Sequence, residues 1–170
     1  MHAKIAIQDA CILIDLINME LLNDCLRLPY YFCTTELIIE ELYDWQKEKL
    51  SACITTGNFS VIAITAQDMA EITSLVVKHP RLSAEDLSAY QYASTNHAVL
   101  LTGDKLLRTL AINASVETGG ILFIFDQLVE HQIILPQKAA ELLKDLCLRN
   151  KRLPTLECDQ RIKRWLELVR

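Results

Sequence analysis

Short β-prone runs alternate with segments of helical periodicity along the first two thirds of this chain. The runs are residues 4–7, 31–33, 60–64 and 98–101, and a helical pattern separates nearly every neighbouring pair. Parallel strands need a crossover connection, which is usually a helix, so this order predicts βαβ units. We therefore expect an α/β fold in which helices cover both faces of a short parallel sheet.

The helices are predicted from apolar spacing and from capping residues. Apolar spacing predicts a helix over 11–26, and Thr34 or Thr35 can begin another over 36–45. Thr65 and Ser83 each open a capping box, which predicts one helix ending at Pro80 and another ending near residue 96. A further helix is expected from about residue 105 to 112.

Beyond residues 119–120 the pattern predicts only helices, over 121–131, 137–149 and 159–169. We interpret residues 1–118 as an α/β core and residues 119–170 as a C-terminal helical extension of the same compact unit. A length of 170 residues, 51% of them hydrophobic, suits one domain with one substantial core.

The charge of the chain and the length of its apolar runs limit the functions that this sequence can have. The formal net charge of −5 argues against an open, sequence-blind binder of nucleic acid, although residues 144–170 hold 8 Lys and Arg against 4 Asp and Glu. This basic end is either a phosphate-facing surface or the solvated face of an amphipathic helix. The longest apolar run, 121–125, is far short of the ~20 residues that cross a bilayer. The sequence shows no signal-peptide pattern either, so we expect a cytoplasmic protein without membrane contact.

We interpret the six cysteines as reduced residues that pack in the protein interior.

Three aspartates share one local setting. Asp9 and Asp104 each follow a predicted strand and precede a helix, and Asp86 lies in the first turn of its helix. Each alone is explained as a helix cap. Together they would line the edge where parallel strands end, and carboxylates crowded there repel one another and favour a bound cation. Oxygen ligands suit Mg²⁺ or Mn²⁺, and no Gly-rich phosphate loop competes with this site.

Four blocks resemble, in order, the PIN-domain ribonucleases, particularly the VapC-like toxins. The blocks are residues 5–15 around Asp9, residues 35–42 with Thr35 and Glu41, residues 82–93 with Asp86, and residues 100–108 with Thr102 and Asp104. The resemblance spans roughly residues 4–118. It implies a three-layer α/β/α fold in which Asp9, Glu41, Asp86 and Asp104 hold Mg²⁺ or Mn²⁺, with Thr102 as a hydroxyl contributor.

The same resemblance implies a metal-dependent endoribonuclease that leaves a 5′-phosphate and a 3′-hydroxyl. It also implies the toxin of a toxin–antitoxin pair, with a small antitoxin as partner and a homodimeric assembly. RNA that is single-stranded or looped is the expected substrate, because an acidic cleft reaches exposed phosphates more readily there than in a duplex.

Several alternatives stay open at this stage. Glu40, Glu85 and Asp15 lie close in sequence to Glu41, Asp86 and Asp9, and we favour Glu41 over Glu40 because it lies on the apolar stripe of its predicted helix. Either Lys105 or Arg108 could meet a substrate phosphate or restrain the acidic cluster by a salt bridge. Where the family commonly has a hydroxyl or amide residue after the first Asp, this chain has Ala10-Cys11, which favours an inactive protein-interaction module. A phosphotransfer or phosphatase site is the other rival, although a DxDx[TV] pattern is absent at Asp9.

Overall fold

A single parallel sheet organises the computed structural model, which describes residues 4–168. The strands are β1 (Lys4–Gln8), β2 (Tyr30–Thr35), β3 (Phe59–Ile62), β4 (Val99–Leu101) and β5 (Thr118–Gly119), in the order β3-β2-β1-β4-β5. Ile7 in β1 is opposite Cys33 in β2 and Leu100 in β4. The chain therefore extends the sheet on one side of β1 and later on the other, and the predicted α/β class is confirmed.

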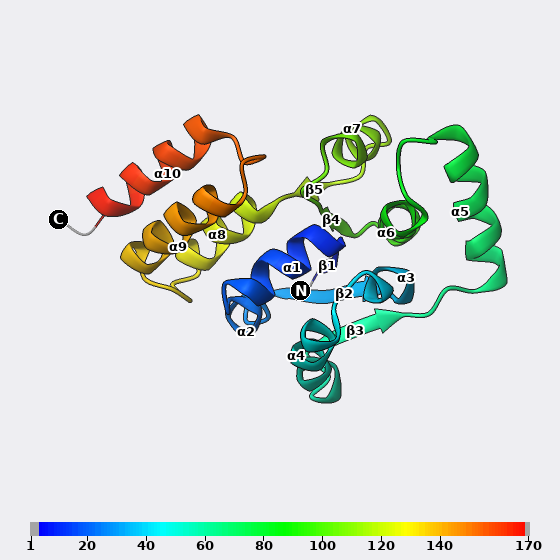
Figure 1. The fold of residues 1–170 in the computed structure, drawn as a ribbon, viewed down its shortest axis with the longest axis horizontal. Helices are drawn as coiled ribbons and strands as arrows, with labels where there is room; N and C mark the ends of the chain where they lie inside the picture. The colour runs from blue at the N-terminus through cyan, green and yellow to red at the C-terminus, as the bar shows by residue number, and fades with distance from the viewer. Residues whose placement is uncertain (1–3, 169–170) are drawn as a thin grey trace.

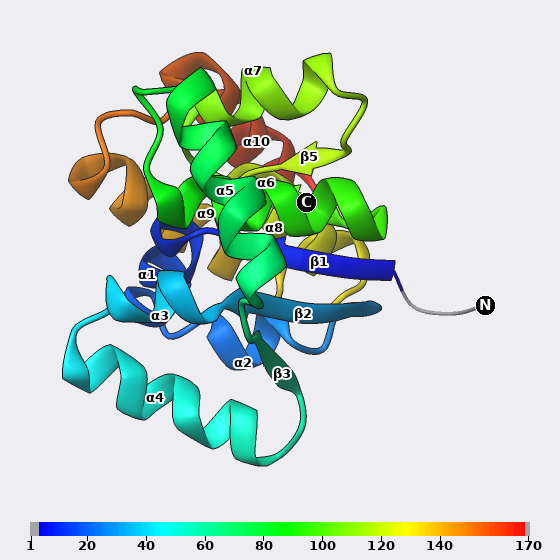
Figure 2. The same cartoon turned by 90° about the vertical axis from the view of Figure 1, so that its right-hand side faces the viewer.

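Helices cover both faces of this sheet (Figure 1). On one face α6 (Ala84–Asn96) packs across β1, β2 and β4, in contact with α3 (Glu36–Glu40), α5 (Ala66–Lys78) and α7 (Lys105–Asn113). On the other face lie α1 (Ala10–Asn18), α2 (Leu22–Cys25) and α8 (Ile121–Glu130), followed outward by α9 (Pro136–Arg149) and α10 (Thr155–Glu167). Figure 2 shows α4 (Asp44–Thr55) beyond the β3 edge. The predicted three-layer α/β/α architecture is confirmed.

The core is continuous from one helical layer to the other through the sheet. Ile7 and Leu100 on neighbouring strands are fully buried, as are Leu13 on α1 and Leu87 on α6. Apolar strands buried on both faces are typical of parallel sheets, which explains why the strand runs in this sequence show little polar alternation.

The predicted helix over 11–26 is two helices in the structure. Glu20 has a left-handed backbone with φ of 57°, and its amide donates to the carbonyl of Ile17. This conformation ends α1 and starts α2 in a new direction, so that Leu16 and Leu22 are both buried.

The predicted helix over 36–45 is wrong in its second half. It ends at Glu40, and a new helix, α4, begins at Asp44 after an extended Tyr43 whose amide donates to the side chain of Gln46 at 3.0 Å. No helix was predicted over 46–55. Among its inward positions only Leu50 and Cys53 are buried apolar residues, which is a weak signal for an amphipathic helix.

The three helices predicted beyond residues 119–120 are present, and the differences are an unpredicted strand just before them and an earlier start of the last helix. Thr118 and Gly119 form β5, a strand too short to show any periodicity, and α10 begins at Thr155, directly after Pro154, four residues before its predicted start. Its predicted end at residue 169 lies outside the described residues. Within the described chain, no helix is both long and apolar enough to pass through a membrane. The division into 1–118 and 119–170 stays a prediction.

Candidate metal and nucleic-acid site

The site lies at the edge of the sheet where its parallel strands end. Asp9 directly follows β1, Asp104 follows the neighbouring strand β4 after a short turn, and Asp86 lies in the first turn of α6. The chain leaves β1 toward β2 on one side, whereas β4 lies on the other, so this is a switch point in the strand order. Ligand sites of open α/β sheets form at such points.

Asp9 is the most constrained of the four predicted site residues, with only 1% of its surface exposed. Its Oδ1 accepts the amide of Ile12 at 2.8 Å, its Oδ2 accepts the amide of Gly103 at 3.1 Å, and the Thr102 hydroxyl donates to the same carboxylate. The first bond makes Asp9 the N-cap of α1, and the other two join β1 to the β4–α7 turn. An ionised carboxylate offers about four acceptor positions, so roughly one is left for another partner.

Burial is the main influence on the ionisation of Asp9. It raises the pKa of this carboxyl from 3.8 to about 6, against the lowering effect of the three hydrogen bonds, and the charge of Asp86 adds to the rise. A nearby cation would act in the opposite direction and favour the carboxylate.

Thr102 connects the two strand-end aspartates. This fully buried residue accepts the amide of Asp104 at 2.9 Å through its hydroxyl oxygen, while its hydroxyl proton is directed to Asp9. Asp104 is the N-cap of α7 and accepts the amide of Leu107 at 2.8 Å through Oδ1. One hydroxyl therefore lies between the carboxylate that follows β1 and the backbone of the aspartate that follows β4.

Asp86 is partly buried, and Ser83, not Asp86, is the N-cap of α6. The Ser83 hydroxyl accepts the Asp86 amide at 3.0 Å. Burial raises the pKa of Asp86, a hydrogen bond with the Ser83 side chain lowers it, and the charges of Asp104 and Glu85 raise it again. The carboxylate is thus close enough to Asp104 for the two to repel each other.

Glu41 and Glu40 have different surroundings. Glu41 is the C-cap of α3, and its pKa is raised first by burial and then by the charges of Glu85, Asp86 and Asp9. Glu40 instead forms an exposed ion pair with Lys47 of α4 at 3.4 Å. The break between α3 and α4 therefore turns Glu41 toward the acidic edge and Glu40 toward a lysine.

The donor set fits a hard divalent cation in its chemistry. Within residues 4–168 no three His, Cys, Asp or Glu side chains are grouped closely enough to hold a metal together. Mg²⁺, however, is commonly bound by one or two protein carboxylates with water completing the shell. Asp9 keeps an acceptor position free, and Asp86 adds a second partly buried carboxylate, so these residues suit such an ion.

The structure adds supporting residues that the sequence did not single out. Ser88 of α6 is fully buried and shares a 2.6 Å hydrogen bond with the hydroxyl of Thr35, the N-cap of α3. This bond joins the helix that carries Asp86 to the helix whose C-cap is Glu41. A hydroxyl on the inward face of a helix was the available signal, but its partner is 53 positions away.

Asp15, Arg108 and Cys11 also have assigned surroundings. The Asp15 carboxylate accepts the side-chain amide of Asn150 at 3.3 Å. Arg108 donates to the carbonyl of Thr102 at 2.6 Å, so it binds backbone rather than a carboxylate. Cys11 is exposed, unlike the buried Cys25, Cys33, Cys53 and Cys158, which agree with the predicted packing role.

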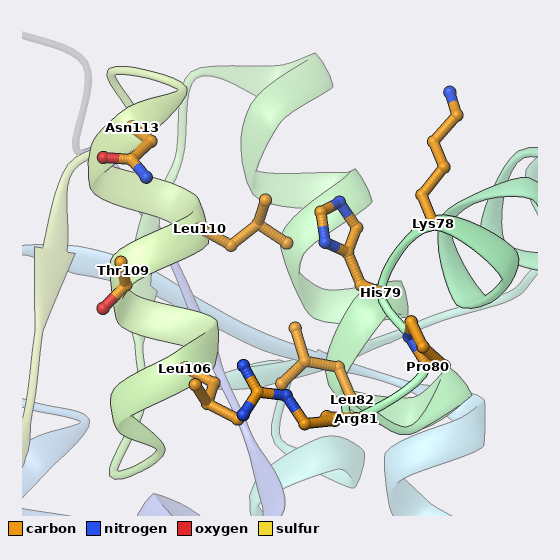
Figure 3. A pocket seen from close by; sticks show the side chains of 9 residues that line it. All are labelled: Lys78, His79, Pro80, Arg81, Leu82, Leu106, Thr109, Leu110 and Asn113. Carbon is orange, nitrogen blue, oxygen red and sulfur yellow. The ribbon is translucent and has the colours of Figure 1, made fainter.

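A separate hollow of about 330 Å³ lies between the α5–α6 connection and α7 (Figure 3). Leu82, Leu106 and Leu110 form its apolar lining, and Lys78 points away from it. None of the four predicted site residues lines this hollow, so it is distinct from the acidic edge.

Comparison with known proteins identifies the family of this chain. A family model described as DUF3368, a PIN domain, matches residues 5–167. The chain belongs to the PIN-domain family. Such domains are typically nucleases that bind nucleic acid. Among solved structures, PAE2754 from Pyrobaculum aerophilum is similar with a TM-score of 0.46 and 18% identity, covering 68% of this chain and 92% of that one. No curated protein matches.

The family-model match confirms the predicted PIN-domain family and its fold. The matched range includes the segment beyond residue 118, so this PIN domain is recognised together with α8, α9 and α10.

Proposed function

We propose that this PIN domain is a metal-dependent endoribonuclease that hydrolyses phosphodiester bonds of single-stranded RNA at Asp9, Glu41, Asp86 and Asp104. The observation that carries the proposal is the setting of Asp9. Its carboxylate is almost fully buried, is held by three hydrogen bonds, and is surrounded by acidic groups that raise one another's pKa. Such an arrangement is costly without a cation and productive with one.

Each residue has a distinct part in this proposal. Asp9 and Asp86 would hold Mg²⁺ or Mn²⁺, with Asp104 and Glu41 completing the site directly or through water. The bound ion would supply an activated water and positive charge against the phosphoryl oxygens. Thr102 keeps Asp9 and Asp104 in register through its two hydrogen bonds. The products would be a 5′-phosphate and a 3′-hydroxyl.

The central experiment compares the wild-type chain with Asp9→Asn on a fluorogenic single-stranded RNA, in Mn²⁺ and in EDTA. We expect cleavage by the wild type in Mn²⁺ only, and a loss of at least about 100-fold in Asp9→Asn, because that change removes a charged group from the reacting centre. Asp159→Asn on the exposed surface of α10 makes the same chemical change away from the site. An inactive wild type, or an active Asp9→Asn, would contradict the proposal.

Glu41→Gln and Glu40→Gln form a second matched pair. Only Glu41 shares its electrostatic surroundings with Asp9 and Asp86, whereas Glu40 pairs with Lys47. We expect Glu41→Gln to lose most of the activity and Glu40→Gln to keep it. The reverse result would move the site to the other glutamate.

We further propose that the enzyme acts in the cytoplasm as a homodimer and as the toxin of a toxin–antitoxin pair. The support is the order of the four VapC-like blocks in the sequence. Growth arrest on expression of the wild type, but not of Asp9→Asn, and rescue by a short upstream reading frame would test the toxin role. Light scattering of the purified chain would test the dimer.

An inactive protein-interaction module is the alternative, favoured by Ala10-Cys11 after Asp9. Against it, Asp9 takes its hydroxyl support from Thr102 rather than from the residue that follows it. Absence of cleavage together with unimpaired folding would favour this alternative.

A further inference from the structure

A hollow of about 340 Å³ next to the acidic edge has a cationic lining. It lies between α7, the first turn of α8 and the α9–α10 connection, and we call it the basic hollow. Its charged residues are Lys105, Arg108, Arg152 and Arg161, with Glu157 as the one carboxylate. Glu157 and Asp126 both pair with Arg161, at 3.6 and 2.8 Å. The other three cations form no ion pair with any residue in the described part of the chain.

Arg108 is fixed at the floor of the basic hollow. Its Nη2 donates to the carbonyl of Thr102 at 2.6 Å, and its Nε is buried without a partner among residues 4–168. A Cβ on Gly120 would lie 2.5 Å from Nη2, so the guanidinium occupies the space that a side chain there would need. Gly120 is the N-cap of α8 and offers no side-chain cap, so the first-turn amides of α8 add their positive dipole to the hollow.

The basic hollow adjoins the carboxylates through Gly103. This residue lines the hollow, and its amide donates to Oδ2 of Asp9 at 3.1 Å. Arg152 lies near the same place, because it lines a neighbouring hollow together with Cys11, which follows Asp9 by two residues. Anything that fills the hollow would therefore be next to the proposed scissile position.

Two hydrogen bonds of Asn150 anchor the α9–α10 connection where it carries Arg152. The amide of Arg152 donates to Oδ1 of Asn150 at 3.1 Å, and Nδ2 of Asn150 donates to Asp15 on α1 at 3.3 Å. Arg152 also lines a second hollow of about 490 Å³, together with Arg149 and Lys151. Cationic side chains thus continue from the basic hollow along the connection.

We propose that the basic hollow binds a backbone phosphate of the RNA strand adjacent to the scissile one, through Lys105, Arg108 and Arg152. This rests on the proposed function for the identity of the strand. Guanidinium and ammonium groups beside a helix N-terminus match the charge and the acceptor oxygens of a phosphodiester. The contacts give the acidic chain a local attraction for RNA that its net charge of −5 does not supply.

The experiment measures binding, not cleavage. Fluorescence anisotropy of a labelled single-stranded RNA is recorded in EDTA over a series of KCl concentrations for wild type, Arg152→Gln and Lys105→Gln. Lys163→Gln on α10 is the matched control, because Lys163 is exposed and lines neither hollow. Thermal unfolding of each variant verifies that the fold is intact, and a gel verifies that the RNA is uncut.

We expect Arg152→Gln and Lys105→Gln each to weaken binding by about 3- to 10-fold and to reduce the slope of log Kd against log salt by about 0.7. Lys163→Gln should leave both unchanged. Equal affinity and slope in all four proteins would overturn the proposal. The proposal would also be overturned if Arg152→Gln weakened the binding of an oligoglutamate peptide but not of RNA. The basic hollow would then dock an acidic protein segment.

The outcomes separate this inference from the nuclease assignment. If Arg152→Gln weakens RNA binding but the wild type shows no metal-dependent cleavage, RNA binding at the basic hollow is supported and the nuclease proposal is contradicted. If cleavage depends on Asp9 but Arg152→Gln leaves RNA binding unchanged, the nuclease proposal is supported and RNA binding at the basic hollow is contradicted.

Discussion

Replacing Asp9 by Asn should change how the stability of the metal-free protein depends on pH. Burial raises the pKa of Asp9 from 3.8 to about 6, so between these values the folded state keeps a proton that the unfolded state releases. The stability that protonated Asp9 contributes is complete below about pH 3.8 and is lost as the pH rises through 6. The difference between the folded and unfolded pKa values of Asp9 corresponds to about 3 kcal/mol of unfolding free energy. About 2 kcal/mol of this is lost between pH 4.5 and 7.5.

Urea unfolding in EDTA across that pH range measures this contribution. The free energy of unfolding of Asp9→Asn minus that of the wild type should rise by about 2 kcal/mol from pH 4.5 to 7.5, because the asparagine has no charge to bury. Asp86 and Glu41 are present in both proteins, so their own titrations largely cancel in the difference. Asp159→Asn, at an exposed position, should show no such trend. A difference between Asp9→Asn and wild type that is constant with pH would refute the reasoning.

Two further substitutions test the packing around the site. A Cβ at Gly119 would lie 2.8 Å from Cδ2 of Leu101 in the core, so Gly119→Ala should lower the free energy of unfolding by about 1–3 kcal/mol. Gly103→Ala is its control because the nearest atom would be at an ordinary 3.5 Å; an equal loss in both would argue against close packing at β5. Trp165→Ala should cost about 3–5 kcal/mol in one cooperative urea transition, since this α10 side chain is 1% exposed. Leu168→Ala, at 66% exposed, should cost little. A separate early transition would show that α10 folds independently of the sheet.

The sequence predicted most elements of the sheet because its strands are continuous apolar runs with clear helix caps after them. Asp9 and Asp104 could be placed for the same reason, since each lies between a strand and the helix that it caps. The capping box before Asp86 likewise predicted α6 to within a residue. Local patterns were sufficient wherever neighbouring residues decide the conformation.

Features that depend on distant contacts could not be predicted in this way. The break after Glu40 has no Gly or Pro to mark it in the sequence, so the predicted helix continued through residue 45 with Glu41 on its apolar stripe, whereas in the structure Glu41 is the C-cap of α3. The strand β5 has only two residues and exists because Leu101 pairs with Gly119. The basic hollow combines α7, α8 and the α9–α10 connection, and no spacing in the sequence indicates that these three segments meet.

The anchored α9–α10 connection also affects the entropy of binding. Its residues 150–154 lie between two packed helices, and Asn150 ties its start to α1 before any ligand arrives. A phosphate at Arg152 would therefore restrict one side chain, at about 0.5–1.5 kcal/mol, whereas an unanchored connection would also lose about 1–2 kcal/mol of backbone freedom for each residue fixed. Part of the affinity for RNA would thus be determined by Asn150 and Asp15, residues that need not touch the RNA at all.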